Sequence, residues 1–326
     1  MESSTSTFTI DIRRLRVLRE LRQRGTIGAT AKALSLTPSA ISQQIAALSR
    51  EIGVPLLTPQ GRGVRLTQQA ELLLEHATAI DVELERARAD LAAFEEGTVG
   101  RVVLGSFATA ITGLVAPALE RLRRERPRLR LAVREIDAEC FALLDRGELD
   151  VVITVDHRGW PARGDRRYAR WDLLDDHLLV AVPQGHPLAA KRSIDLLALA
   201  DEPWILGCAA GPCQESSLAA CAAAGFAPDI VHRVNDWSAL LKLVAAGCGV
   251  GLVPELAMGS APAAGVILRP PSGLQRPCRH LYAAVRAGAE RSPCIAPVVD
   301  ALVATAQEHA AAPAQAAPRV ARLRAR

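Results

Sequence analysis

Four residues at the start of an expected helix have the short side chains that contact with DNA bases requires. They are Pro38, Ser39, Ser42 and Gln43, and the preceding Thr37 with Pro38 is typical of a helix N-terminus. The Gln43 amide can form two hydrogen bonds with adenine, and the Ser42 hydroxyl can reach a base or a phosphate. The alternative is that these side chains only solvate an exposed face, so the surrounding elements must decide between the two interpretations.

Apolar spacing predicts three short helices in this part of the chain. Residues 12–24 form an amphipathic stripe, with Asp11 as the expected N-cap and Gly25 as the stop, and Thr26 can cap a second helix over 27–34. The third helix has its apolar residues on one face, at Ile41, Ile45, Leu48 and Ile52. A short turn joins the second and third helices, which is the spacing of a helix-turn-helix motif.

A glycine-rich segment and an excess of positive charge accompany this motif. Residues 61–66 predict a small hairpin, on which Arg62 and Arg65 are suited to phosphate or minor-groove contact. Residues 1–66 hold ten basic and four acidic side chains, among them Lys32 and Arg50, which are either DNA-backbone contacts or ordinary surface charge. A basic block in a chain of net charge +4 indicates a winged nucleic-acid-binding module joined to an acidic body.

A single long helix is expected from Gln68 to about Phe94, with Thr67 as its cap. Its apolar residues repeat in alternating steps of four and three, at Leu73, Ala77, Ile80, Leu84, Ala87, Leu91 and Phe94. A seam one stripe wide fits one partner helix, so we expect dimerisation through Leu73, Ile80, Leu84 and Leu91. The alternative is packing against the chain's own body.

From Gly100 onward the pattern changes to strands that alternate with helices. The expected strands are 101–105, 129–135, 150–154, 177–183, 204–206, 229–234, 250–254, 266–268 and 280–285, and the helices are 109–126, 139–146, 214–224, 237–246 and one from 293. The two sets before and after about residue 160 predict two α/β lobes. In such folds ligands bind at the carboxyl ends of strands, beside helix N-termini that attract anions.

The residues at these strand ends are the candidate ligand-binding positions. For any single one, a capping residue or a core contact is about as good an interpretation, but as a set they favour a pocket lining. They are Ser106, Phe107, Thr109, Thr154, Val155, Gly207, Cys208, Asn235 and Asp236.

Composition and absent motifs exclude several classes. The chain has 326 residues, 49% hydrophobic and 23% charged, with no apolar run of membrane-spanning length and no visible signal peptide. Seven cysteines without C-x-x-C spacing indicate reduced thiols in the cytoplasm, and no metal or cofactor motif is visible. No nucleophile–base motif supports an enzyme. The Ala-, Pro- and Arg-rich residues 311–326 are expected to be disordered.

The stretch over residues 29–67 resembles the DNA-binding domain of LysR-type transcriptional regulators. Shared features are Ser42-Gln43-Gln44-Ile45, Gly53-Val54-Pro55-Leu56, Gly61-Arg62 and Leu66-Thr67. Two positions differ, because the family often has Arg where this chain has Gln43, and usually begins the wing with Phe-x-Arg where this chain has Leu57-Thr58-Pro59.

The resemblance covers about residues 10–310 and implies a fold of class α + α/β. Its parts are a winged helix-turn-helix over 1–66, a dimerisation helix over 67–96, and a two-lobed effector domain over 97–310 that resembles periplasmic binding proteins. It implies a cytoplasmic regulator with three partners: double-stranded DNA, a small-molecule effector and itself, as homodimer or homotetramer. No membrane is implied.

Two other functions remain as alternatives. Peroxide-sensing members of the family carry two cysteines in the region of Cys213 and Cys221, so a thiol-based redox sensor is the first. The two thiols lie eight residues apart on one expected helix, about 12 Å, too far for a disulfide while the helix is intact. The second alternative is an α/β enzyme.

Overall fold

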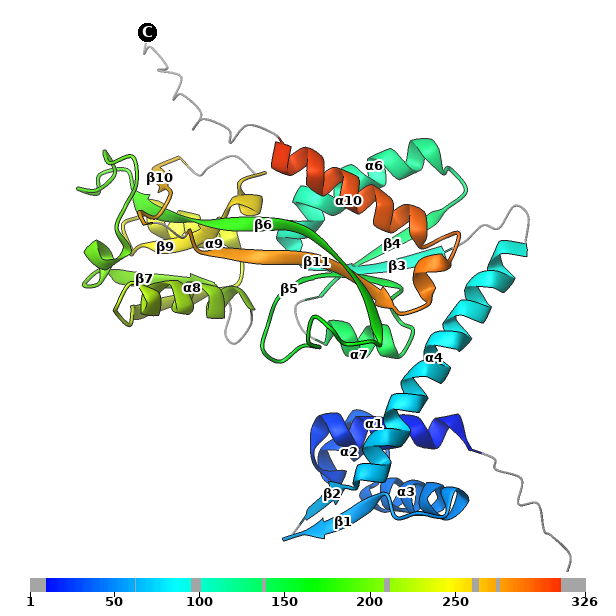
Figure 1. The fold of residues 1–326 in the computed structure, drawn as a ribbon. Helices are drawn as coiled ribbons and strands as arrows, with labels where there is room; N and C mark the ends of the chain where they lie inside the picture. Colours follow the sequence, from blue (N-terminus) through cyan, green and yellow to red (C-terminus); the bar gives the residue numbers. More distant parts are fainter. Residues whose placement is uncertain are drawn as a thin grey trace, which may run out of the picture. The chain divides into compact units, whose positions relative to one another are not determined.

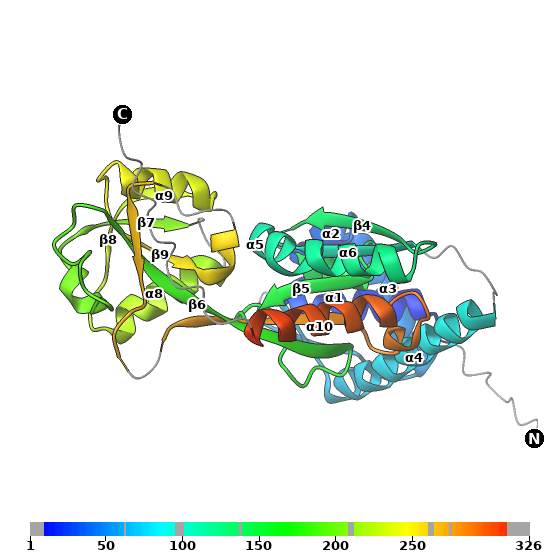
Figure 2. The same ribbon diagram turned by 90° about the horizontal axis from the view of Figure 1, so that it is seen from above.

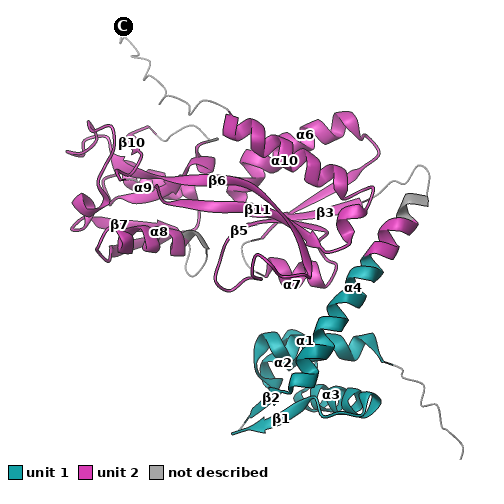
Figure 3. Ribbon diagram, in the orientation of Figure 1, with its two compact units in different colours: residues 1–85 teal, residues 86–326 magenta. Residues whose placement is uncertain are grey.

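The computed structural model describes residues 10–61, 63–94, 101–136, 139–207, 212–259, 264–273 and 276–311. Two compact units make up the chain, residues 1–85 and residues 86–326, coloured separately in Figure 3. No helix among the described residues has both the length and the apolar character needed to cross a membrane.

The first unit begins with the three expected helices, α1 (Ile12–Arg24), α2 (Ile27–Ala33) and α3 (Pro38–Ile52) (Figure 1). The carboxylate of Asp11 accepts a hydrogen bond from the Arg13 amide, and the Thr26 and Thr37 side chains cap α2 and α3 in the same manner. Gly25 and Gly53 end α1 and α3 with φ of 74° and 78°, a backbone region that favours glycine. The predicted helices are therefore confirmed, with α2 one residue shorter than expected.

A two-stranded antiparallel hairpin, β1 (Leu57–Gln60) and β2 (Gly63–Leu66), follows α3 and forms the wing. Its first strand begins at Leu57, four residues before the expected hairpin. The helix α4 (Gln68–Phe94) then starts where predicted, with the Thr67 hydroxyl accepting from the Ala70 amide at 3.1 Å. The core of the first unit joins the buried faces of α1 and α3 to Ala70, Leu74 and Ala77 of α4.

The first lobe of the second unit is built on a sheet in which β4, β3, β5, β11 and β6 are neighbours in that order. β3 is parallel to β4 and β5, whereas β11 is antiparallel to both β5 and β6. The strands are β3 (Arg101–Ser106), β4 (Arg130–Glu135), β5 (Val151–Val155), β6 (Tyr168–Pro183) and β11 (Cys278–Arg286).

Helices cover both faces of this sheet. One core joins the strands to α6 and α10, and a second, on the other face, includes α7 (Cys140–Asp145) (Figure 1). Successive β5 residues alternate between these cores, with Ile153 in the first and Val152 in the second. The expected helix 109–126 is observed as three consecutive elements, α5 (Ala108–Ala110), a π-helical turn η1 (Ile111–Val115) and α6 (Ala116–Glu125). The elements that follow β11 are η4 (Ala289–Arg291) and α10 (Ala296–Ala311).

The second lobe uses the other end of β6, which pairs with β9 and β10, while β7 pairs in parallel with β8. β6 and β11 are the strands that run between the lobes (Figure 2). The remaining elements are η2 (Leu196–Leu199), β7 (Pro203–Gly207), α8 (Pro212–Ala223), β8 (Asp229–Val234), α9 (Trp237–Ala245), β9 (Gly251–Pro254), η3 (Glu255–Gly259) and β10 (Val266–Arg269).

The prediction that the two lobes follow one another along the sequence is wrong for two parts of the chain. The expected strand 177–183 is the second half of β6, which begins at Tyr168, and β11 with α10 returns to the first lobe. Arg170 and Asp172 interrupt the apolar pattern of this first half. The Arg170 guanidinium pairs with Asp156 at 2.7 Å and with Asp172 at 3.2 Å, and it lies 3.5 Å from the centre of the Tyr282 ring, so both charges have partners.

Candidate DNA-binding surface and effector site

The two faces of α3 differ in burial in the manner that a recognition helix requires. Ile41 and Leu48 are fully buried and Ile45 is 2% exposed, so the rotation of the helix about its axis is set by its core side. The four candidate residues lie on the outside, and all are exposed: Pro38, Ser39, Ser42 and Gln43. The predicted DNA-facing surface is thus accessible along the first two turns of α3.

The polar groups on this face differ in their availability. The Ser42 hydroxyl donates to the Pro38 carbonyl at 3.0 Å, which leaves its oxygen lone pairs as acceptors. The side-chain amide of Gln43 makes no hydrogen bond with the part of the chain that the structure describes. Both its NH₂ donor and its oxygen acceptor are therefore available to a base edge. Gln44, the next residue, accepts from Arg14 Nε at 3.3 Å and is engaged within the unit.

Positive charge in the first unit is partly neutralised and partly free. Four arginines of α1 form ion pairs with carboxylates: Arg14 with Glu51, Arg19 with Asp81, Arg22 with Glu71 and Arg24 with Glu20. Lys32, Arg50 and Arg65 are exposed and have no ion pair among the described residues. Arg13 and Arg16 of α1 are likewise exposed and have no ion pair among the described residues, so the charges available to phosphates lie on α1, α2, α3 and the wing. Arg62 lies outside the described residues.

The predicted seam of α4 splits into two parts. Ala77 is buried in the core of the first unit and Leu73 packs against that core. Ile80, Leu84 and Leu91 are 40%, 45% and 69% exposed. The α4 face over residues 80–91 is thus a stripe of apolar side chains in contact with solvent, while the start of the seam is used within the chain. The Phe94 side chain is outside the described residues.

In the first lobe, the candidate effector residues gather at the carboxyl ends of β3 and β5. Ser106 and Thr154 are 0% and 2% exposed, and Val155 is 3% exposed. The Ser106 hydroxyl is buried and has no hydrogen-bond partner among the described residues. A buried hydroxyl without a partner costs free energy, so Ser106 is a position where a ligand atom would be stabilising.

Thr109 and Phe107 are tied to an arginine that sequence reasoning missed. The Arg279 guanidinium donates to the Thr109 hydroxyl at 3.2 Å and lies 5.1 Å from the centre of the Phe107 ring. It also forms a buried ion pair with Asp176, whose other carboxylate oxygen accepts from the Leu256 amide at 2.9 Å. No sequence pattern marks these two charges, because they meet across β6 and β11.

In the second lobe, two of the candidate effector residues have a role in the fold itself: Asp236 caps a helix and Gly207 packs against a tryptophan. Asp236 is exposed and caps α9, accepting from the Ala239 amide at 2.8 Å and from the Ser238 hydroxyl. These hydrogen bonds hold the pKa of the Asp236 carboxyl below its usual value. Gly207 is buried against Trp237, where a Cβ would lie 3.2 Å from the indole ring. Asn235 is exposed, and Cys208 lies outside the described residues.

Two contacts show that the carboxyl ends of the two sheets face one another. His157, just after β5, has its Nε2 3.1 Å from Glu215 Oε1 in the first turn of α8. On the other side, a Cβ at Gly113 of η1 would lie 2.5 Å from the Leu256 side chain of η3, so glycine permits this close approach. The candidate residues of the two lobes lie at these facing ends.

The cysteines of the redox alternative lie on one helix, as expected. Cys221 is fully buried, and burial raises its pKa to about 11, so the thiol is protonated at neutral pH. The side chain of Cys213 is outside the described residues. Since both residues belong to α8, a disulfide between them would require this helix to unwind.

Comparisons with known proteins agree with this arrangement. Residues 12–71 match the family described as bacterial regulatory helix-turn-helix protein, lysR family, and residues 95–307 match the LysR substrate binding domain. The chain is 28% identical over 270 residues to the transcriptional regulator XapR of Escherichia coli, covering 81% of this chain and 88% of XapR. It is also 28% identical over 306 residues to the Escherichia coli regulator MetR, covering 92% and 91%.

A solved structure supports the fold. A cysteine mutant of OxyR from Corynebacterium glutamicum superposes with a TM-score of 0.57 at 22% identity, covering 94% of each chain. A winged helix-turn-helix joined to two α/β lobes defines a transcriptional regulator with an effector-binding domain. The chain belongs to the LysR family of these regulators.

Proposed function

We propose that this regulator reads double-stranded DNA with the first turns of α3, with Gln43 contacting a base and the wing contacting phosphates through Arg62 and Arg65. The observation that carries this proposal is the unengaged Gln43 amide on an exposed polar face whose opposite side is fully buried. A recognition helix enters the major groove with its N-terminal residues toward the base edges. Binding to chromosomal DNA would place the protein in the cytoplasm.

The active form in this proposal is a dimer, or a dimer of dimers, joined through the exposed apolar stripe of α4. Two copies of α3 would then contact two half-sites of an interrupted palindrome, because protein symmetry is mirrored in the operator. The side chains available for this contact are Ile80, Leu84 and Leu91.

The effector in this proposal is a small molecule held where the carboxyl ends of the two sheets face one another. The Ser106 hydroxyl supports this location, since it is buried without a hydrogen-bond partner in the described part of the chain and a ligand atom would supply one. The bound molecule is a signal and not a substrate, so the purified protein is expected to leave it chemically unchanged. A shift in lobe geometry would carry the signal to DNA binding.

Selection from a random pool of DNA duplexes with the purified full chain tests this function. The expected result is enrichment of an interrupted palindrome, and a metabolite found by thermal shift should change the affinity for it. Enrichment of no sequence would contradict the DNA-binding part of the proposal. Conversion of the metabolite into a product would favour the enzyme alternative.

A further inference from the structure

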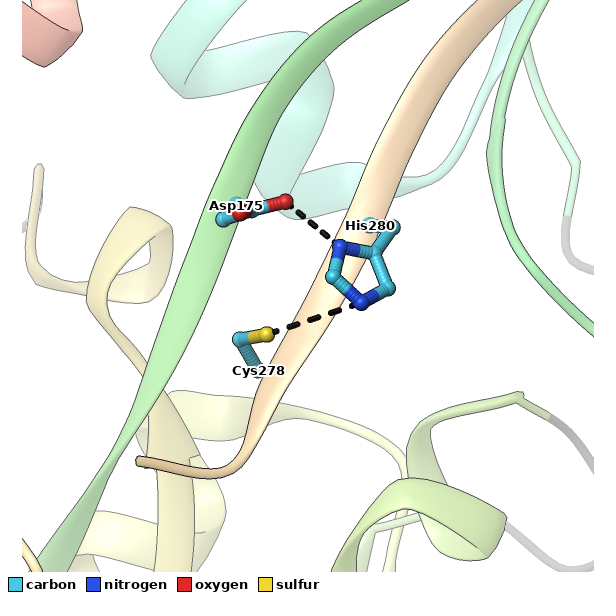
Figure 4. A group of neighbouring side chains, drawn as sticks. All are labelled: Asp175, Cys278 and His280. Atoms are coloured by element: carbon cyan, nitrogen blue, oxygen red, sulfur yellow. Dashed lines mark hydrogen bonds and ion pairs between the residues drawn. The ribbon is translucent and has the colours of Figure 1, made fainter. Parts of the chain in front are cut away.

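Three side chains able to bind a metal lie together on the strands that run between the lobes (Figure 4). Asp175 of β6 and His280 of β11 are direct cross-strand partners, and Cys278 precedes His280 by two residues on the same strand. Residues two apart on a strand share a face, so all three side chains are on one side of the β6–β11 ribbon. Their ligand atoms lie within 4.8 Å of one another.

The first distance in this cluster, between the cysteine sulfur and the imidazole, is close to the separation of two ligands on one ion. Cys278 Sγ lies 3.8 Å from His280 Nε2. A tetrahedral zinc ion bound by one sulfur and one imidazole nitrogen separates these two atoms by about 3.6 Å. The thiol and the imidazole are therefore placed for a shared ion with little movement.

The contact between His280 and Asp175 is a hydrogen bond, with 2.5 Å between Nδ1 and Oδ1. It places the imidazole proton on Nδ1, because the carboxylate accepts there, and leaves the Nε2 lone pair directed toward Cys278. Metal-binding histidines commonly donate their second ring nitrogen to a carboxylate in this way. Asp175 thus orients the imidazole, while Cys278 and His280 hold the ligand atoms.

A reactive thiol is the other chemistry that a Cys–His–Asp group suggests, and the electrostatics oppose it. Partial burial, together with the negative charges of Asp175 and Asp176, raises the pKa of the Cys278 thiol. Asp175, on the same face as the thiol, is the negative charge next to a bound cation, because the Asp176 carboxylate is paired with Arg279.

A further nitrogen donor lies next to the cluster. His177 is the cross-strand partner of Cys278, so it shares the same face of the ribbon. Its Nδ1 is buried and has no hydrogen-bond partner among the described residues. The His177 ring lies outside the group of ligand atoms within 4.8 Å of one another, so His177 is not counted among the ligands.

We propose that Asp175, Cys278 and His280 form a site for a borderline-soft divalent transition ion such as Zn²⁺. Cys278 Sγ and His280 Nε2 bind the ion, and Asp175 positions the imidazole. On binding, the Cys278 thiol releases one proton to solvent and no redox change occurs. Both ligands of the ion lie on β11, and the hydrogen bond between His280 and Asp175 connects them to β6. Ion binding should therefore stabilise this pairing between the two strands that run between the lobes.

Titration calorimetry of the reduced, metal-free full chain with Zn²⁺ tests the proposal. We expect one ion per chain, and with Co²⁺ a sulfur-to-cobalt charge-transfer band. Cys278→Ser and His280→Ala should weaken this binding by more than about 100-fold, and Asp175→Asn by about 10–100-fold. Mg²⁺, which prefers oxygen ligands, should not compete.

Cys294→Ser is the matched control, because Cys294 is a partly buried thiol in the same lobe with no place in the cluster. It should bind Zn²⁺ as the unaltered chain does. Retained DNA binding and an unchanged circular dichroism spectrum show that each variant folds. Absence of stoichiometric Zn²⁺ binding, or binding unaffected by Cys278→Ser, overturns the proposal. Alkylation of Cys278 that stoichiometric Zn²⁺ does not slow also overturns it.

Discussion

The carboxylate of Asp176 and the guanidinium of Arg279 form an ion pair in which the two side chains are 0% and 1% exposed. They are cross-strand partners of β6 and β11. The pair also bonds the Thr109 hydroxyl of α5 and the Leu256 amide of η3. One buried ion pair therefore links the strands between the lobes to an element beside the candidate effector residues.

Breaking this pair should strongly destabilise the second unit. Asp176→Asn keeps the side-chain shape but leaves the Arg279 charge buried without its counter-charge, which typically costs about 3–5 kcal/mol. Urea denaturation of the full chain, followed by circular dichroism, would show this as a lower midpoint for the transition of the second unit.

The exposed pair between Arg121 and Glu308 is the control for the buried one. Glu308 is 64% exposed and lies 2.7 Å from Arg121, so Glu308→Gln should change stability by less than about 1 kcal/mol. Equal effects of the two substitutions would mean that the Asp176–Arg279 pair does not carry the stability inferred from its burial.

Gln43→Ala should reduce affinity for the selected DNA site by about 1–3 kcal/mol and relax base choice at one position of each half-site. The reason is that the free Gln43 amide would lose two hydrogen bonds to a base edge. Gln23→Ala, an exposed glutamine on α1, is the matched control and should bind as before. Fluorescence anisotropy with cognate and scrambled duplexes measures both, and equal binding by Gln43→Ala and the unaltered chain would remove α3 as the reading face.

Arg65→Ala should act differently, because a phosphate contact carries no sequence information. Affinity for every duplex should fall to a similar extent, and the slope of log affinity against log salt should decrease by about one. A salt titration checks this. A loss confined to the cognate site would instead assign Arg65 to base recognition.

Leu84→Asp should dissociate the dimer, because a charge buried in the helix seam costs several kcal/mol. Leu84 is 45% exposed in the single chain, so the change should leave the subunit folded. Sedimentation velocity should show the loss of the dimer, together with a large fall in operator affinity. Ala79→Asp, which adds the same charge to an exposed position away from the seam, should leave the assembly intact. An unchanged sedimentation profile for Leu84→Asp would place the dimer contact elsewhere.

The first unit could be predicted closely because its signals are local. Asp11, Thr26 and Thr37 cap their helices through bonds within three residues, and Gly25 and Gly53 end theirs with positive φ. The apolar repeat also predicts the long helix α4 correctly. Periodicity alone does not show that Ala77 packs in the core of its own chain and not against a partner helix.

The missed features depend on contacts that are distant in sequence. The first half of β6 was not predicted as a strand because Arg170 and Asp172 interrupt its apolar pattern. These two charges pair with each other, and Arg170 also pairs with Asp156 in the loop after β5. Asp176 and Arg279 are 103 residues apart, and the Asp175–His280 pair is 105 apart. Residue spacing predicts metal or catalytic groups when the ligands are close along the chain, and here the strand register brings them together.

The Ser106 hydroxyl offers a test that separates effector binding from general stability. Because this buried hydroxyl has no partner among the described residues, Ser106→Ala should leave the melting temperature of the free protein unchanged or slightly raised. A metabolite at a hundredfold excess over its dissociation constant stabilises the unaltered chain by about 2.7 kcal/mol. Ser106→Ala should lose much of that gain.

The same thermal-shift experiment distinguishes a small-molecule effector from thiol sensing. Cys213→Ser should keep the metabolite-induced shift nearly intact, while Thr109→Val should reduce it and also lower the stability of the free protein, since the Arg279–Thr109 hydrogen bond is lost. If a redox switch operates instead, peroxide will change operator binding, Cys213→Ser will abolish that response, and mass spectrometry will find a Cys213–Cys221 disulfide. We expect the metabolite response, because a Cys213–Cys221 disulfide requires α8 to unwind, whereas the unpartnered Ser106 hydroxyl is in place before any ligand binds.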